Sequence, residues 1–338
     1  MNVEAAFAYA ERHALQALVV EQSGAIAFEW YGGGYDAVKP HALYSGTKSF
    51  WGVAAVAAEE DGLLRIDEPV ALTLPAWEHG DRARVTLRDL LQLTAGIGFG
   101  GLGNTVPTFE RAAAVELKDP PGERFTYGGI PLQVFGAVLA RKLAPRGLSP
   151  NAYLRERVLD PIGLRVAAWR KLKDGNEPLP TGAFLAAREW LKFGLLVRDR
   201  GTWGDRSIVS AAALARCFIG SEANPRYGAG WWLTPLAQVP DLVYASGSGG
   251  QAMYVVPSAS TVVVKFGASA VDLRRRETFN VAVVELPVGA GAPSQRRSQS
   301  QPVPSRNRPD GRSMTWTRSE SRASADPRGK NESPTQSR

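Results

Sequence analysis

The sequence predicts an α/β protein of the α+β type, in which both ends of the chain build one antiparallel sheet around a large helical insertion. Strand-like runs occur at 17–21 and 25–31 and return at 227–233, 250–256 and 261–266. The stretch from about 63 to 225 instead carries helical patterns joined by Gly- and Pro-rich connections. We expect the functional site between the sheet and the insertion.

The first elements are an amphipathic helix at 3–15 and a hairpin, because Gln22-Ser23-Gly24 separates two strand-like runs. An almost wholly apolar helix headed by Ser45 follows, and Gly62 fits its C-terminal stop. Thr86, with Asp89 three residues later, predicts another helix start. Further helices are expected at about 131–143, 151–158, 183–199, 210–218 and 272–286.

The charge of the chain is concentrated at its C-terminal end. Residues 287–338 hold nine Arg and one Lys against four acidic residues, a net of +6, which leaves +1 for residues 1–286. This Ser/Arg/Pro-rich tail is too poor in aliphatic residues to build a core, so we expect it to be disordered and dispensable. The sequence thus predicts one domain at 1–286, with its sheet region at about 1–62 and 226–286 and its helical region at about 63–225.

Composition and spacing argue against several classes of function. The nearly neutral body gives no sign of nucleic-acid binding, no run reaches membrane-spanning length, and no signal peptide is visible, so a cytoplasmic protein is expected. Cys217 is alone, and His13, His41 and His79 lack metal-ligand spacing. We therefore expect neither a metal nor an organic cofactor, and the sequence leaves the oligomeric state open.

The tetrapeptide Ser45-Gly46-Thr47-Lys48 carries the strongest chemical signal. A serine hydroxyl is a poor nucleophile at neutral pH and needs a base. Residues i and i+3 share a helix face, and a helix start favours anionic intermediates, so a buried, neutral Lys48 is a candidate base for Ser45. In the alternative, this turn lies at the surface, with Lys48 solvated and Ser45 acting only as a helix cap.

Other motifs are weaker. The run Gly96–Gly101 matches G-x-G-x-x-G but follows a helical pattern and opens no helix, so a flexible loop is expected instead of a dinucleotide site. No G-x-S-x-G is present, which argues against an α/β-hydrolase arrangement. Tyr127 lies in a turn-rich segment before a helix, where a phenol could relay a proton, although an isolated tyrosine more often serves packing. The glycines of Ala245–Gln251 permit a close backbone approach.

Taken together, these segments resemble the penicillin-recognising serine hydrolases, and most closely their class C β-lactamase and esterase branch, with its 6-aminohexanoate-dimer hydrolase-like members. The resemblance spans about residues 15–286 and implies a β-lactamase-like fold. Besides Ser45, Lys48 and Tyr127, it rests on 85–91, 121–123, 159–164, 227–232 and 249–251.

The resemblance implies a role for each of these residues. Ser45 would be the acylated nucleophile, Lys48 its base, and Tyr127 the partner for leaving-group protonation and deacylation. The backbone N–H groups of Ser45 and Ser248 would form the oxyanion hole. The neighbouring residues that would bind substrate are Ser246, Gly247 and Gly249.

Two departures from the family pattern affect substrate recognition. The family's Tyr-x-Asn is Tyr127-Gly128-Gly129 here, and its Lys-Thr-Gly is Ala245-Ser246-Gly247. Loss of the cation disfavours a carboxylate ligand by roughly 1.5–3 kcal/mol. We therefore expect an esterase or amidase that cleaves a small, uncharged ester or amide through an acyl-enzyme. The alternatives are a true β-lactamase or D,D-peptidase, with Arg226 restoring the cation, and a degenerate, non-catalytic binding module.

Overall fold

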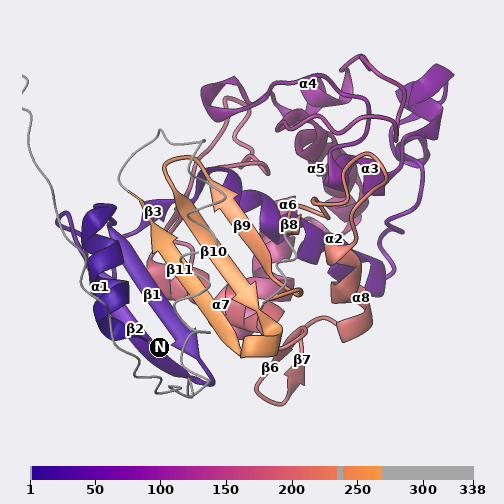
Figure 1. The fold of residues 1–338 in the computed structure, drawn as a ribbon. Helices are drawn as coiled ribbons and strands as arrows, with labels where there is room; N and C mark the ends of the chain where they lie inside the picture. The colour runs from indigo at the N-terminus through magenta and orange to yellow at the C-terminus, as the bar shows by residue number, and fades with distance from the viewer. Residues whose placement is uncertain (1, 234–238, 268–338) are drawn as a thin grey trace, which may run out of the picture. The chain divides into compact units, whose positions relative to one another are not determined.

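The computed structural model describes residues 2–233 and 239–267. Its central feature is a six-stranded sheet in the order β2-β1-β11-β10-β9-β8, in which every neighbouring pair is antiparallel (Figure 1). The strands are β1 (Ala17–Gln22), β2 (Ala25–Tyr31), β8 (Trp232–Leu233), β9 (Val243–Gly247), β10 (Gln251–Val256) and β11 (Thr261–Phe266). The register pairs Val19 of β1 with Val264 of β11, so the N-terminal hairpin and the C-terminal strands form one sheet, as predicted.

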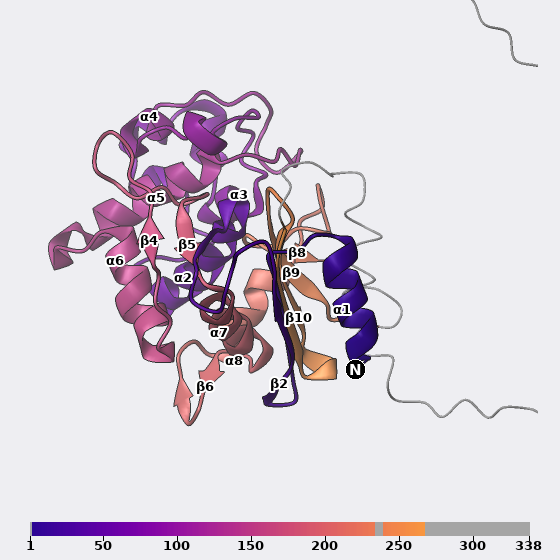
Figure 2. The same ribbon diagram turned by 90° about the vertical axis from the view of Figure 1, so that its left-hand side faces the viewer.

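The sheet is covered on both faces, because alternate side chains of its strands point to opposite sides. On one face, Leu18 and Val263 pack with Ala6 and Ala10 of helix α1 (Val3–Arg12). The other face meets the helical layer, in which α7 (Ala187–Arg198) lies against β10 and β11. Figure 2 shows the sheet edge-on between α1 and the remaining helices.

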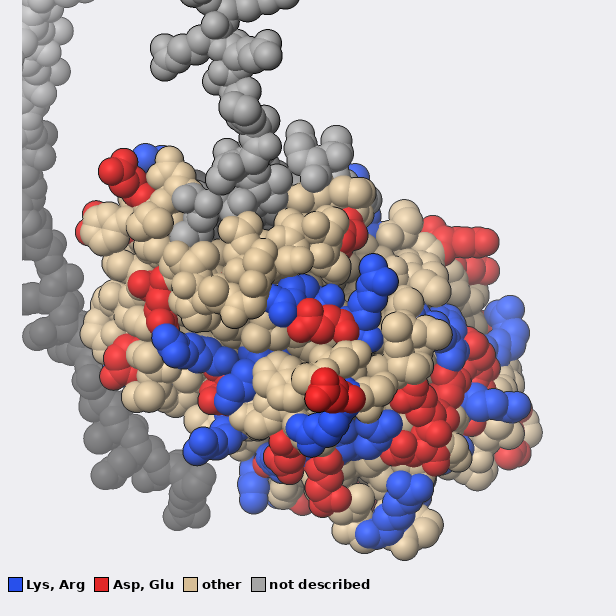
Figure 3. Space-filling model, turned by 90° about the horizontal axis from the view of Figure 1, so that it is seen from below, with Lys and Arg blue, Asp and Glu red and all other residues tan. Residues whose placement is uncertain are grey.

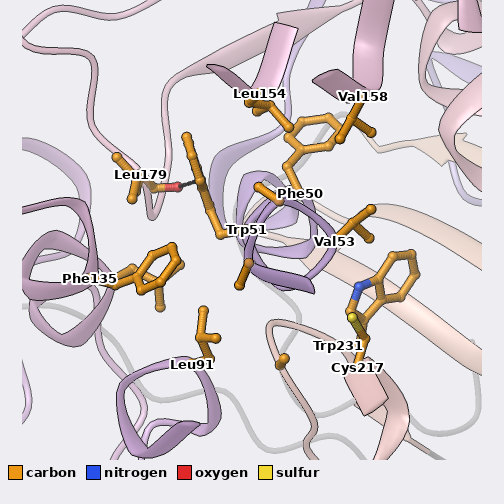
Figure 4. Close-up of a cluster of buried hydrophobic side chains, with 14 of the residues drawn as sticks. Phe50, Trp51, Val53, Leu91, Phe135, Leu154, Val158, Leu179, Cys217 and Trp231 are labelled. Atoms are coloured by element: carbon orange, nitrogen blue, oxygen red, sulfur yellow. Dashed lines mark hydrogen bonds between the residues drawn. The ribbon is translucent and has the colours of Figure 1, made fainter. Parts of the chain in front are cut away.

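Helix α2 (Ser49–Glu60) forms the centre of the helical layer. All its residues from Ser49 to Ala58 are buried, which explains why the sequence is apolar on every side of this helix. Large side chains surround it, and the Trp51 indole donates a 2.6 Å hydrogen bond to the Leu179 carbonyl (Figure 4). As predicted, the helix stops at Gly62, whose φ of +69° suits glycine.

The insertion holds the remaining helices and short strands. Thr86 caps α3 and forms the expected capping box with Asp89. A π-helical turn at Arg155–Leu159 continues α6. The helices of the insertion are α3 (Leu87–Gln92), α4 (Phe109–Ala113), α5 (Ile130–Leu143), α6 (Pro150–Leu154) and α8 (Ala211–Ala215). Its short strands are β4 (Ala168–Trp169), β5 (Ala183–Leu185), β6 (Thr202–Trp203) and β7 (Arg206–Ser207). Strand β3 (His41–Ala42), which precedes the insertion, pairs with β5.

The structure corrects several boundaries. The predicted strand at 227–233 is extended only at β8, because Gly230 has φ +80° and turns the chain so that Tyr227 bridges back to Trp232. Residues 183–185 pair with β3 and β4 instead of starting α7. Strand β9 was not predicted, and the first helix ends at Arg12, before Ala14 adopts φ +45°. The predicted helix at 272–286 and the tail at 287–338 lie outside the described residues.

The surface of the described residues mixes both signs of charge. On the face seen from below, Lys and Arg lie among Asp and Glu (Figure 3). Many of these charges are paired, as between Arg157 and Asp61 at 3.1 Å. No described helix combines the length and the apolar character that a membrane span requires.

Gly52 offers a test of how closely α2 packs. A methyl group at Gly52 would lie 2.1 Å from the Ala229 carbonyl oxygen, although alanine is favoured over glycine in an uncrowded helix by about 1 kcal/mol. We expect Gly52→Ala to lower the unfolding free energy by about 1–3 kcal/mol in denaturant titrations. Gly98→Ala is the control, since its methyl would meet only the exposed Lys118 side chain. A Gly52→Ala protein as stable as the wild type would contradict this packing.

Candidate active site

The Ser45 turn, residues Tyr44–Lys48, is a short 3₁₀ helix that runs directly into α2. The tighter 3₁₀ geometry places residues i and i+3 almost above one another, so Lys48 comes over Ser45. The Lys48 Nζ atom lies 3.0 Å from Ser45 Oγ, within hydrogen-bond distance. Ser45 itself is partly exposed.

Lys48 is only 1% exposed. Burial lowers its pKa from 10.5 to about 7, because the apolar surroundings disfavour the charged ammonium. Within the described part of the chain, no carboxylate forms an ion pair that would offset this effect. Lys48 is therefore uncharged in a large fraction of molecules near neutral pH, and a neutral amine can accept the proton of Ser45. The alternative of a solvated Lys48 is excluded.

A segment of the insertion holds the Lys48 amine in place. Lys48 Nζ donates a 3.2 Å hydrogen bond to the carbonyl of Pro180, next to Leu179, which accepts from the Trp51 indole. The buried Gln133 side chain of α5 accepts from the Leu179 N–H at 2.8 Å. These bonds fix the position of Nζ beside Ser45.

Strand β9 packs directly against the Ser45 turn. A methyl group at Gly247 would lie 2.0 Å from the Leu43 carbonyl oxygen and 3.2 Å from the Gly46 nitrogen. Only glycine allows this approach of the two backbones. The structure thus brings Ser246 and Gly247, at the end of β9, next to the Ser45 turn. Ser248 and Gly249 follow in the turn that leads to β10.

Tyr127 lies close to Lys48. The centre of its ring is 5.0 Å from Lys48 Nζ, and the ring stacks on Trp232 of β8 at 5.7 Å. Phe125 packs beside both rings, at centroid distances of 6.4 and 6.3 Å. Tyr127, Trp232 and Phe125 are each partly exposed, so they form an aromatic wall beside the serine and lysine.

The glycines after Tyr127 explain the run Gly96–Gly101. The Gly129 N–H donates a 2.8 Å hydrogen bond to the Gly100 carbonyl, and a methyl group at Gly129 would lie 1.9 Å from the Gly101 carbonyl oxygen. The run is a loop, as predicted, and its glycines permit close packing beside the Tyr127 segment.

Sequence reasoning missed three contributors to this site: the Pro180 carbonyl, Gln133 and the ring of Trp232. The first is a backbone group, which no sequence pattern reveals. Gln133, fully buried in an apolar helix, gives a faint signal, since a buried amide needs partners. Trp232 belongs to the segment 227–232 that the family resemblance includes, but only the fold places it against Tyr127.

The other candidate groups lie elsewhere. Burial raises the pKa of the Cys217 thiol to about 12, which makes it a poor nucleophile. His41 is stacked between the rings of Tyr35 and Phe266, at 3.9 and 4.0 Å. Over residues 2–233 and 239–267, no group of three or more His, Cys, Asp or Glu side chains is placed to hold a metal ion. Arg226, the alternative cation, is exposed.

Solved structures share this fold. A protein from Bacillus anthracis described as a 6-aminohexanoate-dimer hydrolase superposes with a TM-score of 0.73 at 18% identity, over 84% of this chain and 81% of its own. A class C β-lactamase from Rhodobacter sphaeroides superposes with a TM-score of 0.64 at 17% identity, over 84% of this chain and 98% of its own. EstCE1, a hydrolase with promiscuous acyltransferase activity, superposes with a TM-score of 0.66 at 20% identity, over 83% of this chain and 97% of its own. No curated protein sequence matches the chain.

The sequence itself matches a family model. The model described as Beta-lactamase covers residues 4–285, which is most of the chain. The predicted β-lactamase-like fold and the predicted relation to serine hydrolases are both confirmed. The chain belongs to the Beta-lactamase family of serine hydrolases.

Proposed function

We propose that the protein cleaves a small, uncharged ester or amide through an acyl-enzyme formed on Ser45. The observation that carries this proposal is the position of the Lys48 amine, whose Nζ atom lies 3.0 Å from Ser45 Oγ. The amine is buried, and this burial lowers its pKa to about 7. A base with a pKa near the operating pH combines a useful fraction of the free amine with sufficient proton affinity. A mere helix cap would need no buried lysine, whose desolvation is costly.

In the proposed acylation step, Ser45 Oγ attacks the carbonyl carbon of the substrate and Lys48 Nζ takes the hydroxyl proton. The negative charge on the carbonyl oxygen is held by the backbone N–H groups of Ser45 and Ser248, each worth about 3 kcal/mol in the transition state. The bond to the leaving group then breaks, and the leaving atom receives a proton through Tyr127. Nothing in this step requires a metal or an organic cofactor.

Deacylation reverses the same proton path. A water molecule attacks the acyl carbon, its proton passes to Tyr127 or Lys48, and Ser45 Oγ leaves with a proton returned by Lys48. The 5.0 Å distance between Lys48 Nζ and the centre of the Tyr127 ring supports a shared role. The ammonium that forms during acylation would stabilise a Tyr127 phenolate close by.

The preference for uncharged substrates rests on Ala245. This residue is buried on β9, on the same face as Gly247, because side chains two apart in a strand point the same way. A lysine at this position would reach toward the Ser45 turn, whereas the alanine methyl offers no charge to a carboxylate. EstCE1, which shares this fold, is described as a hydrolase with promiscuous acyltransferase activity, and this supports acyl transfer as the reaction.

A fluorophosphonate probe tests the nucleophile. The wild type should become labelled at Ser45, because an activated serine hydroxyl displaces fluoride from the probe and becomes phosphonylated. Ser45→Ala should not be labelled, and Ser49→Ala, which changes a buried serine in the next turn, should be labelled as the wild type is. Peptide mapping by mass spectrometry locates the adduct. Equal labelling of the wild type and Ser45→Ala would refute the assignment of Ser45, and a wild type that is not labelled would favour a binding module.

The dependence of acylation on pH tests the base. With a Lys48 pKa of about 7, the free amine increases as the pH rises, so kcat/KM should climb through about pH 7 to a plateau. Lys48→Ala should lower kcat/KM about 100- to 10,000-fold and remove this inflection.

Lys265 provides a matched control, since it is also buried, with its pKa lowered by burial, but belongs to β11. Lys265→Met should keep the inflection near pH 7, provided that its circular dichroism remains native. An inflection that survives in Lys48→Ala and disappears in Lys265→Met would reverse the assignment.

The absence of a cation at Ala245 predicts a preference for neutral substrates. The value of kcat/KM for a neutral ester should exceed that for its carboxylate-bearing analogue, and a chromogenic cephalosporin should be hydrolysed weakly. Ala245→Lys should shift this ratio toward the anion by about 10-fold or more, the effect of one charge-assisted hydrogen bond. A wild-type preference for the anion that is lost in Arg226→Ala would instead indicate a penicillin-type substrate.

A further inference from the structure

The residue before the nucleophile has an unusual backbone. Tyr44 has φ +47°, in the left-handed region, where a bulky L-residue is strained. Five other non-glycine residues of the described chain share this feature, and each lies at a helix end or in a tight turn: Ala14, Ser23, Leu93, Arg200 and Ser260. Tyr44 alone opens the helical turn that carries the candidate nucleophile.

Glycine would be the residue without strain at this position. The presence of a tyrosine therefore needs an explanation that lies in its side chain. Within the described residues, the Tyr44 hydroxyl has no hydrogen-bond partner and the ring contacts no other aromatic ring. The residue is 46% exposed, so the fold leaves much of this large side chain without a partner.

The position of Tyr44 makes substrate its natural partner. It is bonded directly to Ser45, which is partly exposed, and the aromatic wall of Phe125, Tyr127 and Trp232 lies beside Lys48. Residues with a strained backbone cluster at active sites and ligand clamps, where the strain is part of the mechanism. Aromatic rings bind apolar and flat groups through their faces.

We propose that Tyr44 is a specificity residue that contacts an apolar group of the ester or amide cleaved at Ser45, and that the strain at Tyr44 is retained for this contact. The inference rests on the proposed function, since it assumes that Ser45 is acylated. It adds a substrate class: esters or amides with a sizeable apolar or aromatic group next to the scissile bond.

The test compares Tyr44→Gly and Tyr44→Ala with the wild type on three esters: p-nitrophenyl acetate, p-nitrophenyl hexanoate and methyl hexanoate. A loss of kcat/KM of about 10-fold or more is expected for the esters that share the contacted group, the size typical of a lost apolar contact. A loss shared by the two hexanoates assigns the contact to the acyl group. A loss shared by the two p-nitrophenyl esters assigns it to the leaving group. Tyr44→Phe should retain the wild-type pattern.

Melting temperatures test the strain independently of activity. Both variants remove the ring, but only glycine relieves the left-handed strain, so Tyr44→Gly should melt about 1–3 °C above Tyr44→Ala and no lower than the wild type. Ser260→Gly and Ser260→Ala form the matched pair, at φ +46° in the turn between β10 and β11.

Two results would overturn the proposal. An equal loss on all three esters would mean that Tyr44 acts through the Ser45 turn and not on substrate. A Tyr44→Gly protein that melts well below the wild type would mean that the ring serves packing. Failure of the proposed function can be distinguished from failure of this inference, because in the first case the fluorophosphonate probe would not label the wild type. The melting comparison would still decide whether Tyr44 is kept at the expense of stability.

Discussion

The structure around the candidate site depends on one constraint, the burial of the Lys48 amine in the apolar layer around α2. Burial lowers the pKa of Lys48 from 10.5 to about 7, which corresponds to a destabilisation on the order of 5 kcal/mol at or below pH 7. The unfolded chain binds this proton more tightly than the folded one, so the penalty shrinks as the pH rises from about 7 toward 10.5. A fold can carry such a penalty only with a large core, and here α2 is buried along almost its whole length.

The surrounding elements hold the Ser45 turn from two sides. Gly247 of β9 packs against the Leu43 carbonyl. A methyl group at Gly230, where φ is +80°, would lie 2.3 Å from the Lys48 carbonyl oxygen. Both glycines belong to the C-terminal part of the chain, whereas Pro180, which accepts from Lys48, belongs to the insertion. The site therefore requires contacts between segments more than 130 residues apart, and it can form only when the sheet and the insertion are both in place.

The proposed function separates the chemistry from the recognition of substrate. In that proposal the chemistry belongs to Ser45 and Lys48, in the turn that leads into α2, and to Tyr127, in the segment before α5. In the same proposal, recognition falls to Ala245, where the chain departs from the family pattern, and to Tyr44, whose backbone is strained. A buried methyl group on β9 and an exposed ring beside Ser45 would both favour apolar substrates over anionic ones.

The sequence by itself determined the fold class, the hairpin, the capping box at Thr86 and the pairing of Ser45 with Lys48. These features depend on local periodicity or on residues three apart, so a short window contains the information. The tertiary structure alone decided that Lys48 is buried, that β9 is a strand, and that 227–230 turns where an extended run was expected. Those outcomes depend on what distant segments pack against: β9 is fixed by its pairing with β10, the turn at Gly230 by the backbone of Lys48, and the Lys48 amine by the carbonyl of Pro180. A backbone carbonyl has no sequence signature, and its placement is set only when the whole chain has folded.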